Sequence, residues 1–279
     1  MSARSRIDLP LLLLGVLLLG LYLPKLALAE HPLYTEWLTE RWLLAVGCTV
    51  KLMALWSGTI VTFRVARSFA SGDGMRLGWT LAAIWLGSWA LAQSVLGVYQ
   101  IGLGRSAPYP SAGDLFFIVG YPAMIAAFVV FARSVTATGL VGTLRAQLTF
   151  AGVAALPGVA LLVVVLRPVV GASTDPLEQL LNVAYPTLDV VALVPALILA
   201  RLGARLAGGA LFFVWALWSA GILFLIAGDL LYAWFSTLEF SALDPLIDVA
   251  YLAGYVLIAR AVFQQHRISV SPRLPAPGG

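Results

Sequence analysis

Long blocks of apolar residues follow one another along the chain, separated by short polar stretches. A helix needs about 20 apolar residues to cross the hydrocarbon core of a bilayer. Blocks of that length occur at Leu9–Ala29, Trp42–Phe63, Leu77–Ile101, Asp114–Ala132, Gln147–Leu166, Leu180–Ala200, Ala210–Phe235 and Leu243–Val262. Unbroken blocks favour helices over the short alternating strands of a membrane barrel. The pattern therefore predicts an all-α, polytopic membrane helix bundle with about eight transmembrane helices.

The composition excludes a soluble globular protein. Hydrophobic residues make up 61% of the 279-residue chain and charged residues only 11%, and the mean hydropathy is +0.95. Soluble domains carry about 25% charged residues because their surfaces face water. No linker rich in Gly, Ser or Pro divides the chain, so residues 1–268 are expected to form a single transmembrane domain. A disordered cytoplasmic tail is expected at 269–279, which is polar and contains Pro and Gly.

The basic residues indicate how the helices are oriented. Arginines precede the first block, follow the last block and occupy every second connection, whereas acids occupy three of the four connections between them. The arginines are Arg4, Arg6, Arg64, Arg67, Arg76, Arg133, Arg145, Arg201, Arg205, Arg260, Arg267 and Arg273, and the acids are Glu30, Glu36, Glu40, Asp175, Glu178, Glu239 and Asp244. Cytoplasmic loops are enriched in basic residues, so both termini are predicted to be cytoplasmic. The net charge of +4 is spread along the chain and does not indicate a nucleic-acid-binding surface.

The first block has a second interpretation. Arg4 and Arg6, a leucine-rich run and Ala27-Leu28-Ala29 before Glu30 also describe a cleaved secretory signal peptide. Cleavage would leave seven helices with an external start and would not change the orientation of any later helix. N-terminal sequencing of the purified protein distinguishes the two interpretations.

The cysteine and histidine content indicates neither a disulfide nor a metal site. Cys48 is the single cysteine and lies within an apolar block, where a small buried side chain is expected. His31 and His266 lie at or beyond block edges and form no cluster at metal-ligand spacing. The sequence therefore predicts no metal and no cofactor.

Several ionisable or polar residues lie inside the blocks, where they are costly and usually face a bundle interior or a wet cavity. They are Lys51, Gln93, Asn182, Asp189, Asp229 and Asp248, with Asp114 near an outer helix end. At about 1.5 Å per residue, the depths of Lys51, Gln93, Asp189, Asp229 and Asp248 below the outer helix ends are roughly 7–13 Å, whereas the bilayer midplane is at about 15 Å. All of them are therefore predicted to lie in the outer half of the membrane.

Helical spacing places these residues on common faces, since positions i, i+3, i+4 and i+7 point the same way. The stripes are Asn182, Tyr185 and Asp189; Asp244, Asp248, Tyr251 and Tyr255; Asp229 and Tyr232; and Trp85, Trp89 and Gln93. Polar stripes on several helices predict an external polar pocket, closed beneath by an apolar plug. The candidate ligand-binding residues are Lys51, Gln93, Asp114, Asn182, Tyr185, Asp189, Asp229, Tyr232, Asp248 and Tyr251. The alternative is that these groups only hydrogen-bond neighbouring helices to one another.

Two helices share the spacing Asp-x5-Gly-Tyr, at Asp114–Tyr121 and Asp248–Tyr255. A second repeated pattern is the dipeptide Tyr-Pro, at Tyr121-Pro122 and Tyr185-Pro186. These matches suggest a duplicated helical unit, and related repeats often build a binding site at their interface.

The chain carries, in order, Pro110–Asp114 through Tyr121-Pro122, Ala184–Asp189, Gly228–Tyr232 and Asp248–Tyr255. Together these segments resemble the multi-helix N-terminal membrane region of some bacterial diguanylate cyclases and sensor histidine kinases, over about residues 75–262. The resemblance implies a sensory input for a signalling domain. No cyclase or kinase domain follows the last block, so signalling would pass through a separate cytoplasmic protein, a homodimer or an output domain of a longer chain.

Three functions fit these features. The first is a sensory or ligand-binding module of a bacterial inner membrane that receives a small ligand from the external side. The second is a small-solute or proton-coupled transporter, which would need a route to both sides of the membrane. The third is a structural subunit of a membrane complex, with nine tryptophans available for lipid or partner contacts. An enzyme is not expected, because no pocket histidine, His-x-x-x-His pair, Gly-x-Ser-x-Gly elbow or phosphate-binding loop is present.

Overall fold

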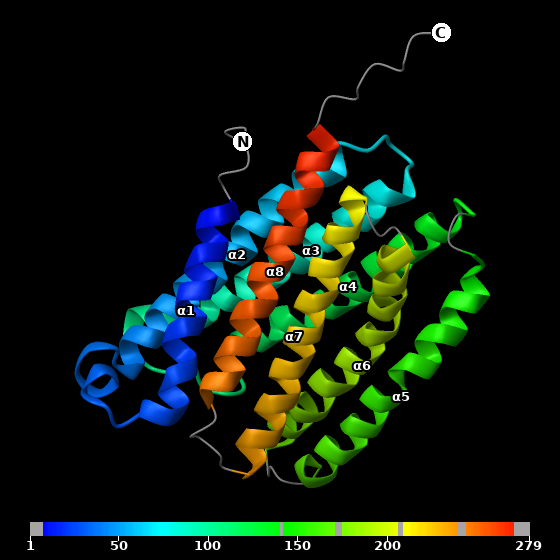
Figure 1. The fold of residues 1–279 in the computed structure, drawn as a ribbon. Helices are drawn as coiled ribbons and strands as arrows, with labels where there is room; N and C mark the ends of the chain where they lie inside the picture. Colours follow the sequence, from blue (N-terminus) through cyan, green and yellow to red (C-terminus); the bar gives the residue numbers. More distant parts are fainter. Residues whose placement is uncertain (1–7, 140–141, 171–174, 206–208, 239–243, 271–279) are drawn as a thin grey trace.

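The computed structural model describes residues 8–139, 142–170, 175–205, 209–238 and 244–270 of the chain. Within these residues the polypeptide forms long α-helices and no strand (Figure 1). The helices are α1 (Asp8–Leu28), α2 (Glu40–Arg67), α3 (Gly74–Gly97), α4 (Ala112–Thr136), α5 (Leu144–Val169), α6 (Pro176–Arg205), α7 (Ala210–Leu238) and α8 (Asp244–Val270). Two π-helical turns, η2 (Leu33–Trp37) and η3 (Val98–Leu103), precede α2 and follow α3. The predicted all-α bundle of about eight helices is confirmed.

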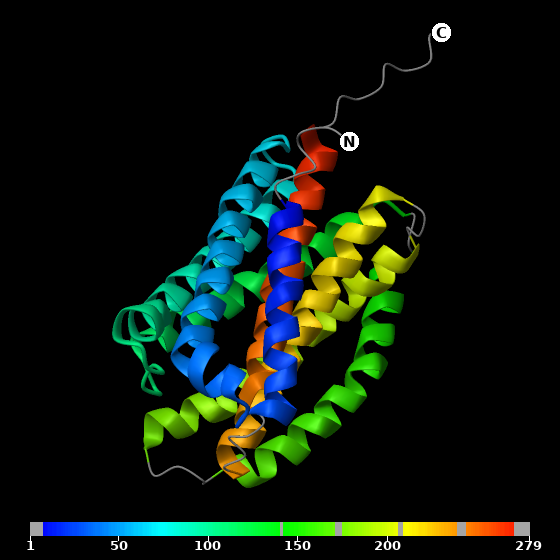
Figure 2. The ribbon, with the colours of Figure 1, turned by 60° about the vertical axis from the view of Figure 1, so that its left-hand side comes forward.

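Seven of the helices are long and apolar enough to cross a membrane, which makes this a multi-pass membrane protein. They are α2 to α8, whereas the apolar part of α1, Leu13–Leu28, is shorter. Helix α1 nevertheless packs lengthwise against α8 (Figure 2). The last helix is longer than its apolar block and continues to Val270. Ser269 and Val270, which were assigned to the disordered tail, are therefore helical, and 271–279 lie outside the described residues.

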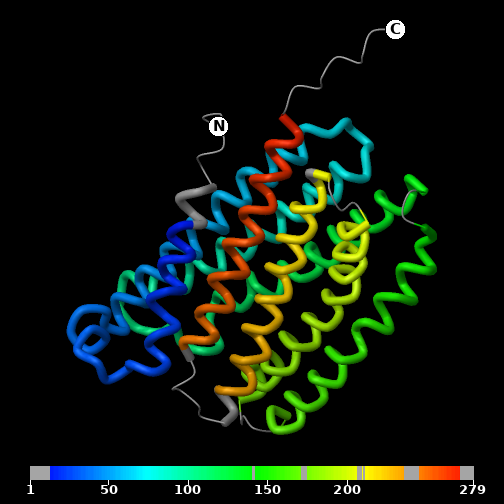
Figure 3. Tube along the Cα trace, in the orientation of Figure 1, coloured from blue at the N-terminus to red at the C-terminus, as the bar shows by residue number. Residues whose placement is uncertain are grey.

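Helix α8 runs through the middle of the bundle, where it packs against α1, α2 and α7 (Figure 1). Helix α3 packs against α2 and α4, and α6 packs against α4, α5 and α7. Helix α1 begins and α8 ends at the same end of the bundle, at the top of the trace in Figure 3. We call this the upper end, and we call the opposite end, which carries the α1–α2 and α3–α4 connections, the lower end.

Polar side chains fix where four of the helices begin. Thr39, Asp73, Ser111 and Thr143 each accept a hydrogen bond from a backbone amide in the first turn of the helix that follows. Such caps satisfy amides that have no partner within the helix. At α4 the cap is reciprocal, because Asp114 also accepts a hydrogen bond from the backbone amide of Ser111.

Aromatic side chains from α3, α4 and α7 fill the upper half of the bundle. Trp79 lies 5.0 Å from Phe131 and 5.1 Å from Trp218 between ring centroids, and Phe131 lies 5.3 Å from Trp215. These four rings are buried, as are Trp85 and Phe128 beside them. Edge-to-face and tilted pairs of this kind add to the packing energy of the buried area. These aromatic rings consequently pack tightly in the upper half.

Glycines allow α7 and α8 to approach closely in the middle of the bundle. A Cβ atom built on Gly254 would lie 2.5 Å from Cδ2 of Leu225 and 3.1 Å from the carbonyl oxygen of Gly221. A Cβ atom on Gly221 would likewise lie 2.9 Å from the carbonyl oxygen of Gly254. Small residues at such crossings let membrane helices pack backbone against backbone.

Replacing Gly254 by leucine should therefore separate α7 from α8. We expect Gly254→Leu to lower the unfolding free energy by about 1–3 kcal/mol, as overpacking usually does. Thermal unfolding in detergent, followed by size-exclusion chromatography, measures the loss. Gly152→Leu is the matched control, because a Cβ atom at Gly152 meets nothing within 4 Å. Equal losses in the two variants would contradict a close α7–α8 crossing.

Candidate functional site

A cavity of about 650 Å³ lies in the lower half of the bundle. Every long helix except α5 contributes side chains to it, and so does the segment 106–111 between η3 and α4. Glu40, Ser106 and Pro108 line it and are exposed, so they mark its rim. Its volume falls within the range of about 300–1,000 Å³ that is typical of small-molecule sites.

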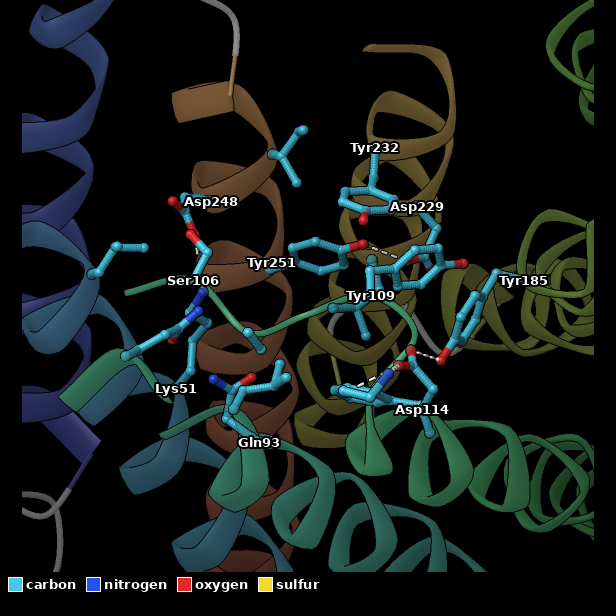
Figure 4. Close-up of a pocket in the computed structure, with 18 of the residues that line it drawn as sticks. Lys51, Gln93, Ser106, Tyr109, Asp114, Tyr185, Asp229, Tyr232, Asp248 and Tyr251 are labelled. Atoms are coloured by element: carbon cyan, nitrogen blue, oxygen red, sulfur yellow. Dashed lines mark hydrogen bonds and ion pairs between the residues drawn. The ribbon is translucent and has the colours of Figure 1, made fainter. Parts of the chain in front are cut away.

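The structure brings most of the candidate residues to this one cavity (Figure 4). Those on its wall are Lys51, Gln93, Asp114, Asn182, Tyr185, Asp229, Tyr232, Asp248 and Tyr251. Asp189 is not on the wall, because it lies beneath Tyr121 and is only 2% exposed. The cavity position of these residues is a structural finding, whereas their role as ligand contacts remains a prediction.

An ion pair joins α2 to α8 on one side of the cavity. The ammonium nitrogen of Lys51 lies 2.9 Å from Oδ1 of Asp248. Lys51 is buried, so the pair neutralises two charges that lipid and packed side chains could not solvate. Beside it, the Gln93 amide donates to Sγ of the fully buried Cys48 at 3.3 Å, which links α3 to α2.

Asp114 connects α4 to α6 on the other side. One of its oxygens accepts from the Ser111 amide at 2.6 Å and from the Ser111 hydroxyl at 3.0 Å. The other oxygen accepts from the Tyr185 hydroxyl at 2.7 Å. Asp114 therefore caps α4 and, through the same carboxylate, holds Tyr185 of α6 in the cavity wall.

A chain of hydrogen bonds leads from the cavity to the buried Asp189. The Tyr251 hydroxyl donates to Oδ1 of Asp229, and the Tyr121 hydroxyl lies 3.1 Å from Oδ2 of Asp229 and 2.7 Å from Oδ1 of Asp189. A phenol has one proton and can donate it to only one of two carboxylates. The second contact therefore requires a proton on a carboxyl group. The geometry fits a carboxyl pair, Asp189 and Asp229, that retains one shared proton.

The segment between η3 and α4 covers part of the cavity. Gly104 ends η3 in the left-handed conformation, with φ +62°, and the chain then crosses toward α4. The Tyr109 hydroxyl donates to Oδ1 of Asn182 at 2.8 Å, and the Tyr109 ring lies edge-on to Tyr232 at 5.6 Å. Burial, reinforced by Tyr232 and by nearby carboxylates, raises the pKa of the Tyr109 hydroxyl. Tyr109 therefore stays a hydrogen-bond donor at neutral pH.

Tyrosine is the residue type that the sequence analysis undervalued. Seven of the nine tyrosines line the cavity, and four of these were not selected as candidates. The four are Tyr22, Tyr109, Tyr121 and Tyr255. A signal was present, because each Tyr-Pro dipeptide of the chain, at 109–110, 121–122 and 185–186, places its tyrosine on the cavity wall.

The repeated Asp-x5-Gly-Tyr motif has the same geometry in α4 and in α8. In each copy the aspartate and the tyrosine line the cavity. The glycine lets the preceding helix approach: a Cβ atom at Gly120 would lie 2.5 Å from Cδ1 of Trp89 in α3, as one at Gly254 would meet Leu225 in α7. The Trp89 ring then lies 5.5 Å from Tyr121 and 6.2 Å from Tyr255. The two copies thus meet at Trp89 on the cavity wall.

Comparisons of the chain with protein-family models, with curated proteins and with solved structures found no match. The resemblance to the membrane regions of diguanylate cyclases and sensor kinases accordingly stays an expectation.

Removing one member of the ion pair should destabilise the protein more than removing both. We expect Lys51→Met to cost up to about 3–5 kcal/mol, because Asp248 is then left without its counter-charge. The loss should lie toward the lower value, since the side chain of Asp248 is 28% exposed. The double variant Lys51→Met with Asp248→Leu should recover most of the stability in thermal unfolding. A double variant as unstable as Lys51→Met alone would contradict this account.

Proposed function

We propose that the protein is a membrane-embedded ligand-binding module of a sensory type, which receives a small solute in the cavity at its lower end. The observation that carries this proposal is that one cavity collects charged and tyrosine side chains from six of the eight long helices. Structural hydrogen bonds between two helices would not need such a volume, and soluble ligands bind in concave sites of this size.

The contacts between helices around the cavity provide a way for ligand binding to change the arrangement of the helices. The Lys51–Asp248 pair joins α2 to α8, and the Asp114–Tyr185 contact joins α4 to α6. A solute that competes for either contact changes the relative stability of two helix arrangements, as a conformational signal requires. Helix α8 carries Asp248 near its start and ends at Val270, so its 27 residues form a rod about 40 Å long toward the upper end.

One observation favours a second function, a proton-coupled carrier. The hydrogen bonds from Tyr251 through Asp229 and Tyr121 to Asp189 lead inward from the cavity, and their geometry fits a proton shared by the two carboxyl groups. Against this stands the packing of the buried rings of Trp79 and Trp218, which fill the space between α3 and α7 toward the upper end. A purely structural role is less favoured, because five of the nine tryptophans are buried inside the bundle and face neither lipid nor partner.

The first test concerns the side from which the cavity is reached. The arginine bias assigns the lower end to the exterior, although Arg41 and Arg105 also lie at that end. In a Cys48→Ser background, which keeps an acceptor for Gln93, we expect Ser106→Cys to react with a membrane-impermeant maleimide on intact cells. Ser71→Cys, in the connection between α2 and α3, should react only after lysis. The reverse pattern would place the cavity on the cytoplasmic side.

The second test concerns binding. Ser106 lines the rim and is exposed, so Ser106→Trp should narrow the entrance without disturbing the core. A library of small polar and cationic solutes is screened for thermal stabilisation of the purified protein. We expect stabilising solutes to act at least tenfold more weakly on Ser106→Trp and equally on Thr35→Trp, an exposed control at the same end.

The outcomes of that screen separate the candidate functions. Stabilisation that Ser106→Trp leaves unchanged would contradict binding in the cavity. A solute that binds and is also accumulated by counterflow in proteoliposomes would assign the protein to the transporters instead. A library without any stabilising solute would leave the structural subunit as the better account.

A further inference from the structure

The charges on the cavity wall are unbalanced. Among the described lining residues there are four carboxylates and two ammonium groups. Lys51 forms an ion pair with Asp248, and in the charge count Lys25 offsets Glu40, which lies at the rim. Two carboxylates, Asp114 and Asp229, are left over, and both face the same space.

The donors that hold these two carboxylates are uncharged. Asp114 accepts from the Ser111 amide and hydroxyl and from the Tyr185 hydroxyl. Asp229 lies within hydrogen-bond distance of the phenol hydroxyls of two cavity tyrosines. Hydroxyls and amides stabilise a carboxylate without cancelling its charge. Even with one proton shared between Asp229 and the buried carboxyl beneath it, this side of the cavity retains net negative charge.

The negative side of the cavity is also its aromatic side. Figure 4 shows Asp114, Tyr185, Asp229 and Tyr232 on one side, and the Lys51–Asp248 pair on the opposite side. The rings of tyrosine carry negative potential on their faces, which attracts cations within about 6 Å of the ring centre. A phenol that donates to a carboxylate gains electron density, so the Tyr185 and Tyr251 rings are better cation partners than free tyrosines.

A bare metal ion does not fit this wall. Among the described residues, no three His, Cys, Asp or Glu side chains lie close enough together to hold a metal ion. Hard cations such as Ca²⁺ require six or more oxygen ligands at about 2.3–2.6 Å. Rings, prolines and leucines make up much of the remaining lining, which suits an apolar cation instead.

We infer that the cavity binds an organic cation, an amine or a quaternary ammonium compound, with its charged group among the tyrosine rings beside Asp114 and Asp229. This inference rests on the proposed ligand-binding function and specifies its ligand class. The Lys51–Asp248 pair, already neutral, borders the far part of the cavity, where an uncharged polar portion of the ligand would lie.

The test compares a cation with its neutral isostere. Choline and 3,3-dimethylbutan-1-ol differ only in the exchange of a quaternary nitrogen for carbon, so shape and hydroxyl group are matched. Binding to the purified full chain in detergent is measured by saturation-transfer NMR and calorimetry. We expect choline to bind at least tenfold more tightly than the alcohol, which corresponds to about 1.4 kcal/mol.

Isosteric variants show which carboxylates are responsible for the preference for the cation. Asp229→Asn and Asp114→Asn keep a hydrogen-bond acceptor for their tyrosines but remove the charge. Each should weaken choline binding at least tenfold and leave binding of the alcohol unchanged. Glu36→Gln removes an exposed acid at the same end, away from the cavity wall, and should change neither affinity. Thermal unfolding of each variant verifies that it is folded, and either aspartate variant alone suffices for the comparison.

The results separate the ligand class from the function. Equal affinity for the two probes, or choline binding that is unchanged in the folded aspartate variants, would overturn the cation inference and leave a ligand-binding cavity in place. Failure of both probes to bind would also overturn it. In that case the effect of Ser106→Trp on other stabilising solutes decides independently whether the cavity binds ligands at all.

Discussion

Lipid and packed side chains offer no hydrogen bonds to a carboxylate, so an acid inside the bundle must find its donors on neighbouring helices. Asp114 meets Tyr185, Asp189 meets Tyr121, Asp229 meets Tyr251, and Asp248 meets Lys51. Every one of these contacts joins two different helices: α4 to α6 twice, α7 to α8, and α8 to α2. The requirement to satisfy the acids thus draws five helices together at one level of the bundle. The cavity is the space that their long polar side chains leave between them.

The helices, and the depth of the polar groups along them, could be predicted from the sequence because both depend on local periodicity. A run of about 20 apolar residues must be helical in lipid, whatever its neighbours are. Helical geometry likewise fixes Asp248, Tyr251 and Tyr255 on one face, and all three line the cavity. The same rule could not predict that Asp189 lies behind the cavity wall, because it identifies the face of a helix and not the side chain that covers it. Here Tyr121 of another helix supplies the cover.

The remaining features depend on contacts between segments that are distant in sequence. Tyr109 lies in a connection without periodicity, and its partner Asn182 is 73 residues away. The pairing of Lys51 with Asp248, in preference to the other acids, follows from the packing of α2 against α8. Such choices are decided by which helices are neighbours, and a single sequence carries no direct record of that. Among the sequence features, the glycines of the repeated motif are the best indication of helix neighbours, since they mark where two helices must touch.

The difference in packing between the two halves of the bundle favours binding of a solute over its transport. Rings such as Trp79, Phe131 and Trp218 fill the upper half, and a solute could cross it only by separating large buried surfaces. The lower half is held by hydrogen bonds and one ion pair, which a polar solute can replace one for one at little net cost. Rearrangement is therefore inexpensive where the cavity lies and costly beyond it. On the proposed function, a solute that enters from the lower end would be held there more easily than conducted, and its effect would reach the upper end through the helices that frame the cavity.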